Sequence, residues 1–201
     1  MIKALILVIL FAIADSAQIP NRTVAITIDD LPVVSTRGDI KNRQQITKKL
    51  LAHIKKAKVP AIGFVNENKL YDKDKRDEKQ IDLLRLWVAG GLELGNHTFS
   101  HRSLNRIELA DYEADLLKGE TITKELLKAK GREMRFFRHP FLQTGRTMEV
   151  KEKFDTFLVE HGYIAAPITF DNADYIFSRA YDIAFDKKDK KLMKQVGDAY
   201  I

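Results

Sequence analysis

Two patterns of apolar residues alternate along the chain. Short apolar runs, several of them rich in β-branched residues, predict strands at residues 23–28, 61–65, 92–94, 134–137 and 163–166. Between them, apolar residues recur at helical spacing, which predicts helices over residues 40–58, around 81–88, over 107–130 with a break near Gly119, and over 147–160. Strands that alternate with helices predict βα units and a parallel sheet, which either curls into a barrel or lies open and doubly wound.

Polar residues gather just after the predicted strands. In parallel α/β architectures the carboxyl ends of the strands converge on one face, and that face carries the active site. Residues far apart in the sequence are therefore predicted to meet there. The residues that follow strands in this way are Asp29, Asp30, His97, His101, Arg138, Asp171 and Asp174.

The stretch GNHTFSH at residues 95–101 holds two histidines, His97 and His101, four positions apart. On a helical turn their side chains would lie on one face, with Cβ atoms about 5–6 Å apart, so both imidazoles could bind one cation. The same spacing also occurs among surface and core histidines that bind nothing. A metal site therefore requires a third ligand from elsewhere in the chain.

Asp29 and Asp30 offer that third ligand. Adjacent residues on a strand point to opposite sides, so the two carboxylates do not easily bind one cation together. One can bind the metal while the other accepts a proton from a metal-bound water, whose pKa the metal lowers toward about 7. Three protein ligands and an open position are typical of a catalytic metal site, and nitrogen and oxygen donors suit zinc. The pattern favours attack of water on an amide or ester carbonyl.

The chain contains no cysteine. This excludes disulfides, cysteine-based zinc sites and thiol nucleophiles. Any bound metal must therefore be held by histidines and carboxylates.

The net charge of +6 is carried partly by lysine-rich runs at residues 55–58 and 187–191. Residues 71–79 alternate in sign, whereas nucleic-acid binding favours basic residues interleaved with aromatic ones or set on a recognisable module. We therefore expect solvated faces and no nucleic-acid partner, with at most loose attraction to an anionic cell-wall polymer.

The first 17 residues, MIKALILVILFAIADSA, have the pattern of a secretory signal peptide. Lys3 precedes an apolar run from Ala4 to Ala14, and the small residues Ser16 and Ala17 follow. The run is shorter than the roughly 20 residues that span a bilayer, so we expect no transmembrane segment. The chain is predicted to be exported to the periplasm or outside the cell, with residues 18–201 forming one catalytic domain.

Four motifs occur in a fixed order, TIDD, NHTFSH, RHPF and DNADY, from Thr27 to about Tyr175. In this order they resemble the polysaccharide deacetylases of the NodB homology type, carbohydrate esterase family 4. The resemblance implies a distorted (β/α) barrel, here incomplete and lacking its last strand or strands. Four ordered motifs are far more specific than any one of them.

The resemblance also implies roles for five residues. Asp29 would be the catalytic base, and Asp30, His97 and His101 would bind a divalent metal, which we expect to be zinc. Arg138 would pair with Asp29 and hold it ionised, because a nearby cation lowers the pKa of a carboxyl group.

Further residues match positions that line the substrate groove in the family. Pro140 and Phe141 would contact the substrate, and the backbone after the Arg-x-Pro motif would help to bind the developing oxyanion. Asp174 and Tyr175 correspond to the family's Asp-Trp pair, with Asp174 in a catalytic supporting role and Tyr175 as an aromatic wall. Taken singly, these residues also fit purely structural roles, such as core packing for Phe141 or a helix N-cap cluster around Asp174.

The family has one more motif, a Leu-x-His whose histidine protonates the leaving amine, and no Leu-x-His follows Tyr175. Without it, general acid catalysis worth about 10²–10⁴-fold would be absent. Three explanations compete: a fragment of a longer gene product, a weakened variant, or a domain completed by another chain. We favour the fragment, because the helical carboxyl-terminal segment ends without a stop signal.

The sequence therefore predicts an exported, metal-dependent hydrolase that removes N-acetyl groups from a glycan or oligosaccharide. The alternative is a protein that keeps the metal and binds carbohydrate but is catalytically impaired.

Overall fold

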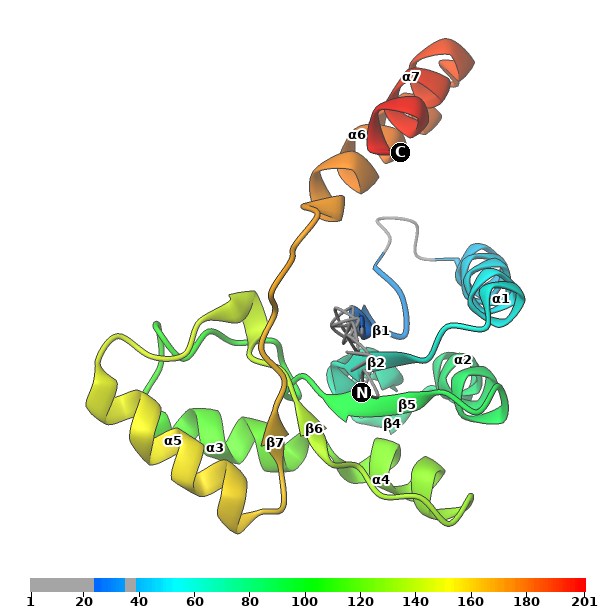
Figure 1. Ribbon diagram of the computed structural model, residues 1–201. Helices are drawn as coiled ribbons and strands as arrows, with labels where there is room; N and C mark the ends of the chain where they lie inside the picture. Colours follow the sequence, from blue (N-terminus) through cyan, green and yellow to red (C-terminus); the bar gives the residue numbers. More distant parts are fainter. Residues whose placement is uncertain (1–23, 35–38) are drawn as a thin grey trace, which may run out of the picture.

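Five strands form one parallel sheet in the computed structural model, which describes residues 24–34 and 39–201 (Figure 1). Every neighbouring pair of strands in this sheet is parallel. The signal peptide predicted at residues 1–17 lies outside the described residues. The strands are β1 (Ile26–Leu31), β2 (Ala61–Val65), β5 (Glu93–Asn96), β6 (Phe136–Phe137) and β7 (Ile164–Ala165).

The order of the strands decides between the two predicted architectures. Their order in the sheet, β1-β2-β5-β6-β7, is their order along the chain. Each new strand is thus added on the same side, as in a (β/α) barrel, whereas a doubly wound sheet reverses direction at a switch point. Within the described residues β1 and β7 are the two edges of the sheet. The predicted α/β fold with an incomplete barrel is confirmed.

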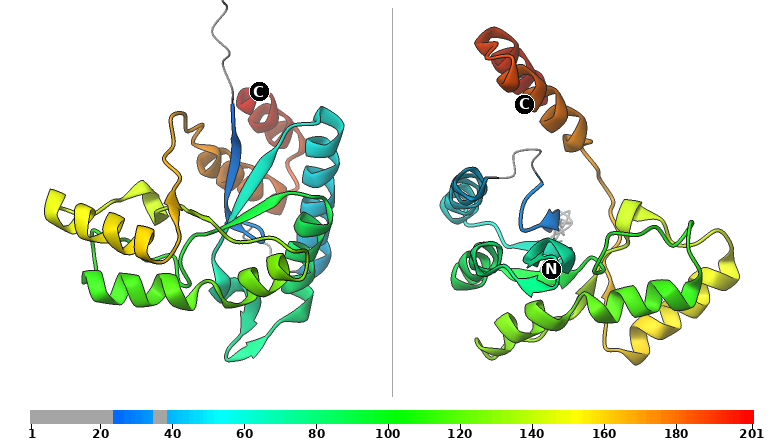
Figure 2. Two further views of the ribbon diagram at one scale, coloured as in Figure 1. Left: turned by 60° about the horizontal axis from the view of Figure 1, so that its bottom comes forward. Right: turned by 180° about the vertical axis from the view of Figure 1, so that it is seen from behind.

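Helices connect successive strands and follow one another around the sheet (Figures 1 and 2). Helix α1 packs against α2, α2 packs against α4, and α3 packs against α5. The break predicted near Gly119 separates α3 from α4. The connecting helices are α1 (Ile40–Ala57), α2 (Glu78–Ala89), α3 (Leu109–Lys118), α4 (Thr121–Lys128) and α5 (Met148–Glu160).

Side chains just before three helices supply the hydrogen-bond acceptors that a helix amino terminus needs. Asp39 accepts from the backbone of Asn42 at the start of α1. Asp77 does the same for Lys79 and Gln80 in α2, and Thr147 accepts from Val150 in α5. These short polar residues explain why the helices begin where they do.

The apolar core fills the space between the sheet and its helices. Gly63 in β2 makes room for it, because a Cβ atom at this position would lie 2.1 Å from Cδ1 of Leu31 and 3.4 Å from the Trp87 ring. Interiors packed at crystal-like density do not accommodate such an overlap. The core includes Leu31, Val65, Leu84, Trp87, Leu94, Tyr112, Phe137 and Phe154.

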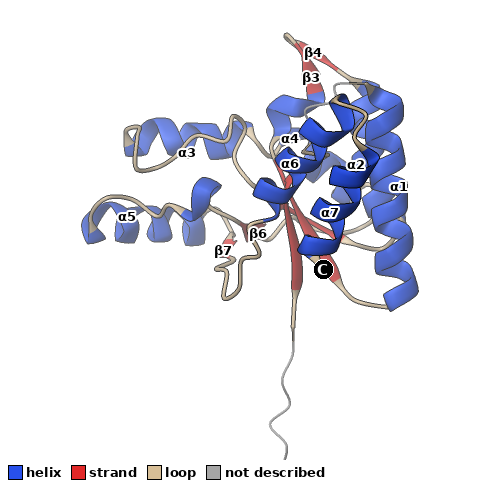
Figure 3. Cartoon of the chain, turned by 90° about the horizontal axis from the view of Figure 1, so that it is seen from above, coloured by secondary structure: helices blue, strands red, loops and turns tan. Residues whose placement is uncertain are grey.

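The remaining elements lie outside the βα repeat. After β2 come the 3₁₀ helix η1 (Glu67–Leu70) and a hairpin of β3 (Tyr71–Asp72) and β4 (Lys75–Arg76), and after β6 comes the 3₁₀ helix η2 (Pro140–Leu142). Helices α6 (Asp174–Asp186) and α7 (Lys190–Tyr200) pack against each other (Figure 3) and stand apart from the sheet (Figures 1 and 2). No helix in the two described ranges combines the length and apolar character needed to cross a membrane.

Two expectations about strand limits need correction. Strand β1 continues through Asp29 and Asp30 to Leu31, so the two carboxylates lie within the strand rather than in a loop after it. It can continue because Leu31 pairs with Val65 of β2 after a break in register. Strands β6 and β7 contain only two residues each, because their pairing extends only over Phe136–Phe137 and Ile164–Ala165.

Candidate metal centre

His97 and His101 lie on a loop after β5, not on a helical turn. The loop reverses because Thr98 and His101 both adopt left-handed backbone conformations, with φ of 61° and 55°. The two rings then meet edge to face, with centroids 5.0 Å apart. The two rings thus come together on a loop, without the helical turn that their spacing would also allow.

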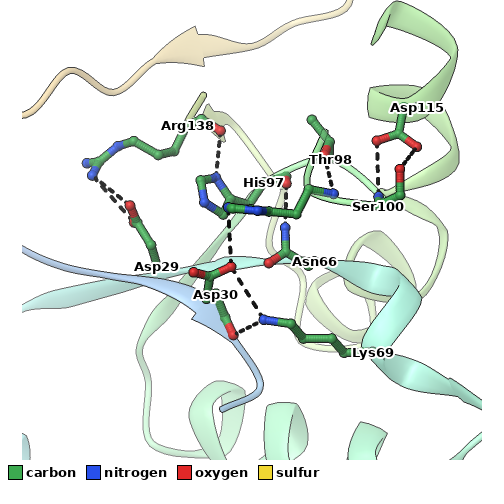
Figure 4. Close-up of polar contacts among 10 residues, drawn as sticks. Asp29, Asp30, Asn66, Lys69, His97, Thr98, Ser100, Asp115 and Arg138 are labelled. Atoms are coloured by element: carbon green, nitrogen blue, oxygen red, sulfur yellow. Dashed lines mark hydrogen bonds and ion pairs between the residues drawn. The ribbon is translucent and has the colours of Figure 1, made fainter. Parts of the chain in front are cut away.

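Buried and half-buried polar side chains hold this loop in place (Figure 4). The amide oxygen of Asn96 accepts a hydrogen bond from the backbone of Thr98 at 2.7 Å, and the Thr98 hydroxyl accepts one from the backbone of His101 at 3.1 Å. The carboxylate of Asp115 on α3 accepts from both the backbone and the hydroxyl of Ser100, at 3.0 and 2.7 Å. Two residues in an uncommon backbone conformation are thus stabilised by directed contacts.

The carboxyl end of α3 approaches the same loop very closely. A Cβ atom on Gly119 would lie 2.5 Å from the backbone of Thr98 and of Phe99. Only glycine allows this approach, so Gly119 both ends α3 and lets the helix support the histidine loop.

Asp30 completes a set of three potential ligands. Its backbone is left-handed, with φ of 65°, at the break in register of β1. Its Oδ1 lies 3.5 Å from Nε2 of His101, and the ligand atoms of Asp30, His97 and His101 all lie within 4.8 Å of one another. The structure therefore brings together the three residues predicted to bind metal.

The environment of His97 suits a metal ligand. Its side chain is buried, and Nδ1 lies 2.7 Å from the backbone carbonyl oxygen of Arg138. A carbonyl can only accept, so Nδ1 donates and Nε2 keeps its lone pair, which is the usual arrangement of a metal-binding histidine. Burial also lowers the pKa of His97 to about 4, which keeps the ring neutral. Burial likewise lowers the pKa of His101, while Asp30 opposes that shift. Two neutral imidazoles and a carboxylate fit a divalent transition metal such as zinc.

Asp29 and Arg138 form an ion pair beside this ligand set, with 3.3 Å between Nη1 of Arg138 and Oδ2 of Asp29. The buried guanidinium also donates to the Ala166 carbonyl at 2.6 Å and to the Thr27 hydroxyl at 3.3 Å. Burial raises the pKa of Asp29 more than Arg138 lowers it, so the net shift is upward from the usual value. The expectation that Arg138 would dominate this pKa is corrected, because removing the carboxylate from water has the larger effect.

Phe141 is the predicted substrate-contacting residue that reaches the ligands. Its ring centroid lies 4.5 Å from that of His101, yet 57% of the residue is exposed. Phe141 has φ of 57°, and the adjacent Pro140 is buried. An exposed aromatic ring held against a candidate ligand can form one wall of a binding surface.

Asp174 and Tyr175 are placed differently from each other. Asp174 begins α6 and lies near enough to Asp29 to contribute to the rise in its pKa. Tyr175 is 67% exposed, and none of the contacts among the described residues joins it to the ligands. Asp171 and Asn172 accept hydrogen bonds from the backbone of Ala173 and Asp174. The N-cap residue of α6 is Ala173, and no side chain caps the helix there, so the alternative of a helix N-cap cluster is not confirmed.

Two residues that the sequence reasoning missed also contact the site. Asn66 donates to the backbone carbonyl of His97 at 2.6 Å. Lys69 donates to the backbone carbonyl of Asp30 at 2.8 Å and lies 3.4 Å from its Oδ1. Both follow β2, so the rule that gathered polar residues at strand ends could have found them.

The sequence model of the family described as polysaccharide deacetylase matches residues 16–156. No curated protein sequence matches the chain.

Several solved structures resemble the chain. The chitin deacetylase of the fungal pathogen Colletotrichum lindemuthianum is 26% identical, with a TM-score of 0.56 over 76% of this chain and 57% of that one. A family 4 carbohydrate esterase from Streptomyces lividans, solved with acetate, is 19% identical, with a TM-score of 0.55 over 78% of this chain and 67% of that one. A carbohydrate esterase family 4 pseudoenzyme from Bacillus anthracis is 16% identical, with a TM-score of 0.53 over 90% of this chain and 52% of that one. The Streptomyces lividans and Bacillus anthracis structures, which are less than 25% identical to this chain, share its fold. The chain spans between about half and two thirds of these structures.

Proposed function

Because the chain belongs to the polysaccharide deacetylase family, we propose that it is a metal-dependent hydrolase that removes N-acetyl groups from a carbohydrate. One observation carries the proposal: Asp30, His97 and His101 offer ligand atoms within 4.8 Å of one another, directly beside the Asp29–Arg138 ion pair. A ligand set next to a paired carboxylate is the arrangement that metal-assisted hydrolysis of an amide requires.

Asp30, His97 and His101 would hold the divalent cation, and their nitrogen and oxygen donors favour zinc. The cation would polarise the amide carbonyl and make a water molecule more acidic. The hydrogen bond from Nδ1 of His97 to Arg138 orients the ring, and the Thr98 and Asp115 contacts fix the loop that carries His101. These residues set the geometry before any substrate arrives.

Asp29 would act as the general base. Burial raises its pKa, which makes the ionised carboxylate a stronger proton acceptor than an exposed aspartate. Arg138 holds the carboxylate by its guanidinium, and the buried contacts of Arg138 fix the guanidinium in turn. Asp30 and Asp174 add further negative charge in this neighbourhood.

Phe141 would provide the apolar wall against which a sugar ring packs, next to Pro140 and the backbone that follows it. Its exposed ring lies against His101, so a sugar stacked on it would place an acetamido group near the ligands. This supports an N-acetylated glycan or oligosaccharide as the substrate class. The proposal includes export, which rests on the amino-terminal sequence pattern, and loose association with an anionic cell wall.

Acetate release from N-acetylglucosamine oligomers tests the function directly. The full chain with zinc should release acetate, and Asp29→Asn should reduce the rate by about 10²–10⁴-fold, the usual contribution of a general base. Asp72→Asn, at an exposed carboxylate on β3, is the matched control and should leave the rate unchanged. Release that is equally fast in Asp29→Asn would refute the role of Asp29.

A second candidate function is favoured by the positions of the other histidines. His53 is exposed on α1, His139 is hydrogen-bonded to Tyr112, and His161 is bonded to its own helix α5. None of these three described histidines is placed to protonate a leaving amine at the candidate site. A chain that binds zinc and the oligomers but releases no acetate would therefore be a carbohydrate-binding protein with impaired catalysis.

A further inference from the structure

The positively charged side chain of Lys69 contacts Asp30, one of the three candidate metal ligands (Figure 4). Its Nζ donates to the backbone carbonyl oxygen of Asp30 at 2.8 Å and lies 3.4 Å from Oδ1 of the same residue. Both side chains are mostly shielded, with 28% of Lys69 and 30% of Asp30 exposed. The ammonium group therefore contacts both the backbone and the carboxylate of Asp30.

The contact with the carbonyl holds Lys69 in place. Asp30 has a left-handed backbone at the point where the β1–β2 register breaks, and its carbonyl oxygen accepts a hydrogen bond from Lys69. This bond is shorter than the contact with Oδ1, so a cation that takes Oδ1 would not by itself release the ammonium. The lysine would remain beside the site after a metal had bound.

Both aspartates at the site have a cationic partner before any divalent cation binds. Asp29 faces Arg138 at 3.3 Å, and Asp30 faces Lys69 at 3.4 Å, so each of the two adjacent carboxylates has its own cationic partner. A divalent cation would therefore enter a site in which each of these carboxylates already has a cationic partner, one of them the ammonium group of Lys69.

We propose that Lys69 sets the affinity of this site for divalent cations, by competing for Oδ1 of Asp30 and by repelling the cation that binds there. Like charges held a few ångströms apart in a partly shielded site repel strongly, and a long side chain anchored at its tip cannot move away freely. The inference rests on the metal site of the proposed function but does not depend on deacetylation. It makes Lys69 an affinity-setting residue rather than a catalytic one.

Zinc binding to the purified full chain, measured by titration calorimetry with zinc alone, tests the proposal. Lys69→Met removes the charge and keeps an unbranched chain of similar size, so zinc should bind at least about tenfold more tightly, which corresponds to about 1.4 kcal/mol. Lys69→Arg keeps a positive charge and should stay within about threefold of the unaltered chain, far less than the tenfold change that 1.4 kcal/mol represents. Lys79→Met, at an exposed lysine on α2, is the control and should change nothing.

Thermal unfolding supplies a second readout that does not need activity. Without zinc, Lys69→Met should unfold at a lower temperature, because Asp30 would lose its partner beside Asp29. With saturating zinc the rise in unfolding temperature should be larger than in the unaltered chain, since tighter binding stabilises the folded state more. Lys69→Gln, a shorter neutral variant, should show the same two trends if Lys69→Met does not fold.

The outcomes separate this inference from the proposed function. If the unaltered chain binds zinc and His97→Ala does not, but neither neutral Lys69 variant binds zinc more tightly, only the inference about Lys69 is overturned. If the unaltered chain binds no zinc at all, the metal site fails, and both the proposed function and this inference fall.

Discussion

The ring of His97 donates its Nδ1 hydrogen to the backbone carbonyl oxygen of Arg138, over 2.7 Å. This bond joins a candidate metal ligand to the residue whose guanidinium pairs with Asp29. Arg138 thus contacts both parts of the site. Its backbone carbonyl orients the ring of His97, and its guanidinium holds the carboxylate of Asp29. Substitution of the side chain can separate the two contributions.

Arg138→Lys should reduce acetate release while leaving zinc binding nearly intact. The backbone bond to His97 remains, but the lysine cannot reproduce the guanidinium contacts with Asp29, Thr27 and Ala166. Hydrogen bonds to charged groups contribute about 1.5–3 kcal/mol, so the rate should fall about 10–100-fold. Calorimetry with zinc and acetate release from the same preparation measure the two effects.

Arg135→Lys, at an exposed arginine before β6, is the matched control and should change neither quantity. A loss of zinc affinity in Arg138→Lys as large as the loss of rate would contradict the separation of roles.

Asp115→Ala should weaken zinc binding although Asp115 is not a ligand. It accepts two hydrogen bonds from Ser100, in the loop between the two candidate ligands. Partners that orient metal ligands typically affect affinity by about 10–100-fold. The zinc dissociation constant should rise by about that factor, whereas Asp111→Ala, at an exposed position of the same helix, should leave it unchanged. Equal zinc affinity in both variants would show that the loop holds its shape without Asp115.

The buried His139 should make the protein less stable in acid. Burial lowers its pKa from the ordinary 6.5 to about 4, so between these values the unfolded chain takes up a proton that the folded chain does not. Stability should therefore fall as the pH drops from about 6.5 to about 4, and this residue should account for about 3 kcal/mol of the loss. Urea unfolding at several pH values measures the change.

The variant for this test has to avoid leaving a buried hydroxyl unpaired, because the Tyr112 hydroxyl lies 3.1 Å from Nδ1 of His139. The double variant Tyr112→Phe with His139→Phe removes both polar groups and should lose about 3 kcal/mol less on acidification. Tyr112→Phe alone retains the histidine and should keep the full acid dependence. Identical pH profiles for the double variant and the unaltered chain would rule out His139 as the source.

Glu67 should be important for the stability of α4. Its fully buried carboxylate accepts hydrogen bonds from the backbone of Ile122 and Thr123, at 3.1 and 2.6 Å, and so caps a helix that lies 55 residues later in the chain. In Glu67→Gln the side-chain NH2 group replaces one carboxylate oxygen, and it cannot accept the hydrogen bond from the backbone N–H that it faces. Unfolding free energy should fall by about 1–3 kcal/mol, the cost of an unsatisfied buried polar group.

The exposed Glu78, in the first turn of α2, provides the comparison. Glu78→Gln should change the unfolding free energy by less than about 0.5 kcal/mol, as expected for a surface substitution. If the two variants are equally stable, the cap from Glu67 is not a significant contribution.

Much of the fold could be predicted because it depends on local patterns. Apolar periodicity located the connecting helices and the parallel strands, since each pattern reflects which face of an element is buried. The strand ends were less predictable. Strand β1 continues through Asp29 and Asp30 because of a register break with β2, and no local signal marks such a break.

The candidate site shows the same division. His97, His101 and the Asp29–Asp30 pair could be selected from residue type, order and the absence of cysteine. The polar residues after β2 were overlooked, although Asn66 and Lys69 lie at the same edge of the sheet as the other site residues.

The sequence by itself determined the types of element, the ligand chemistry and the family, because periodicity, composition and ordered motifs are properties of the chain alone. Tertiary structure decided the strand order, the left-handed backbones that aim Asp30 and His101, the net direction of the Asp29 pKa shift and the contact of Lys69 with Asp30. The physical reason is that each of these depends on burial and on groups distant in sequence. Lys69 and Asp30 are 39 residues apart, and Arg138 and Asp29 are 109 apart, so only folding brings their charges together.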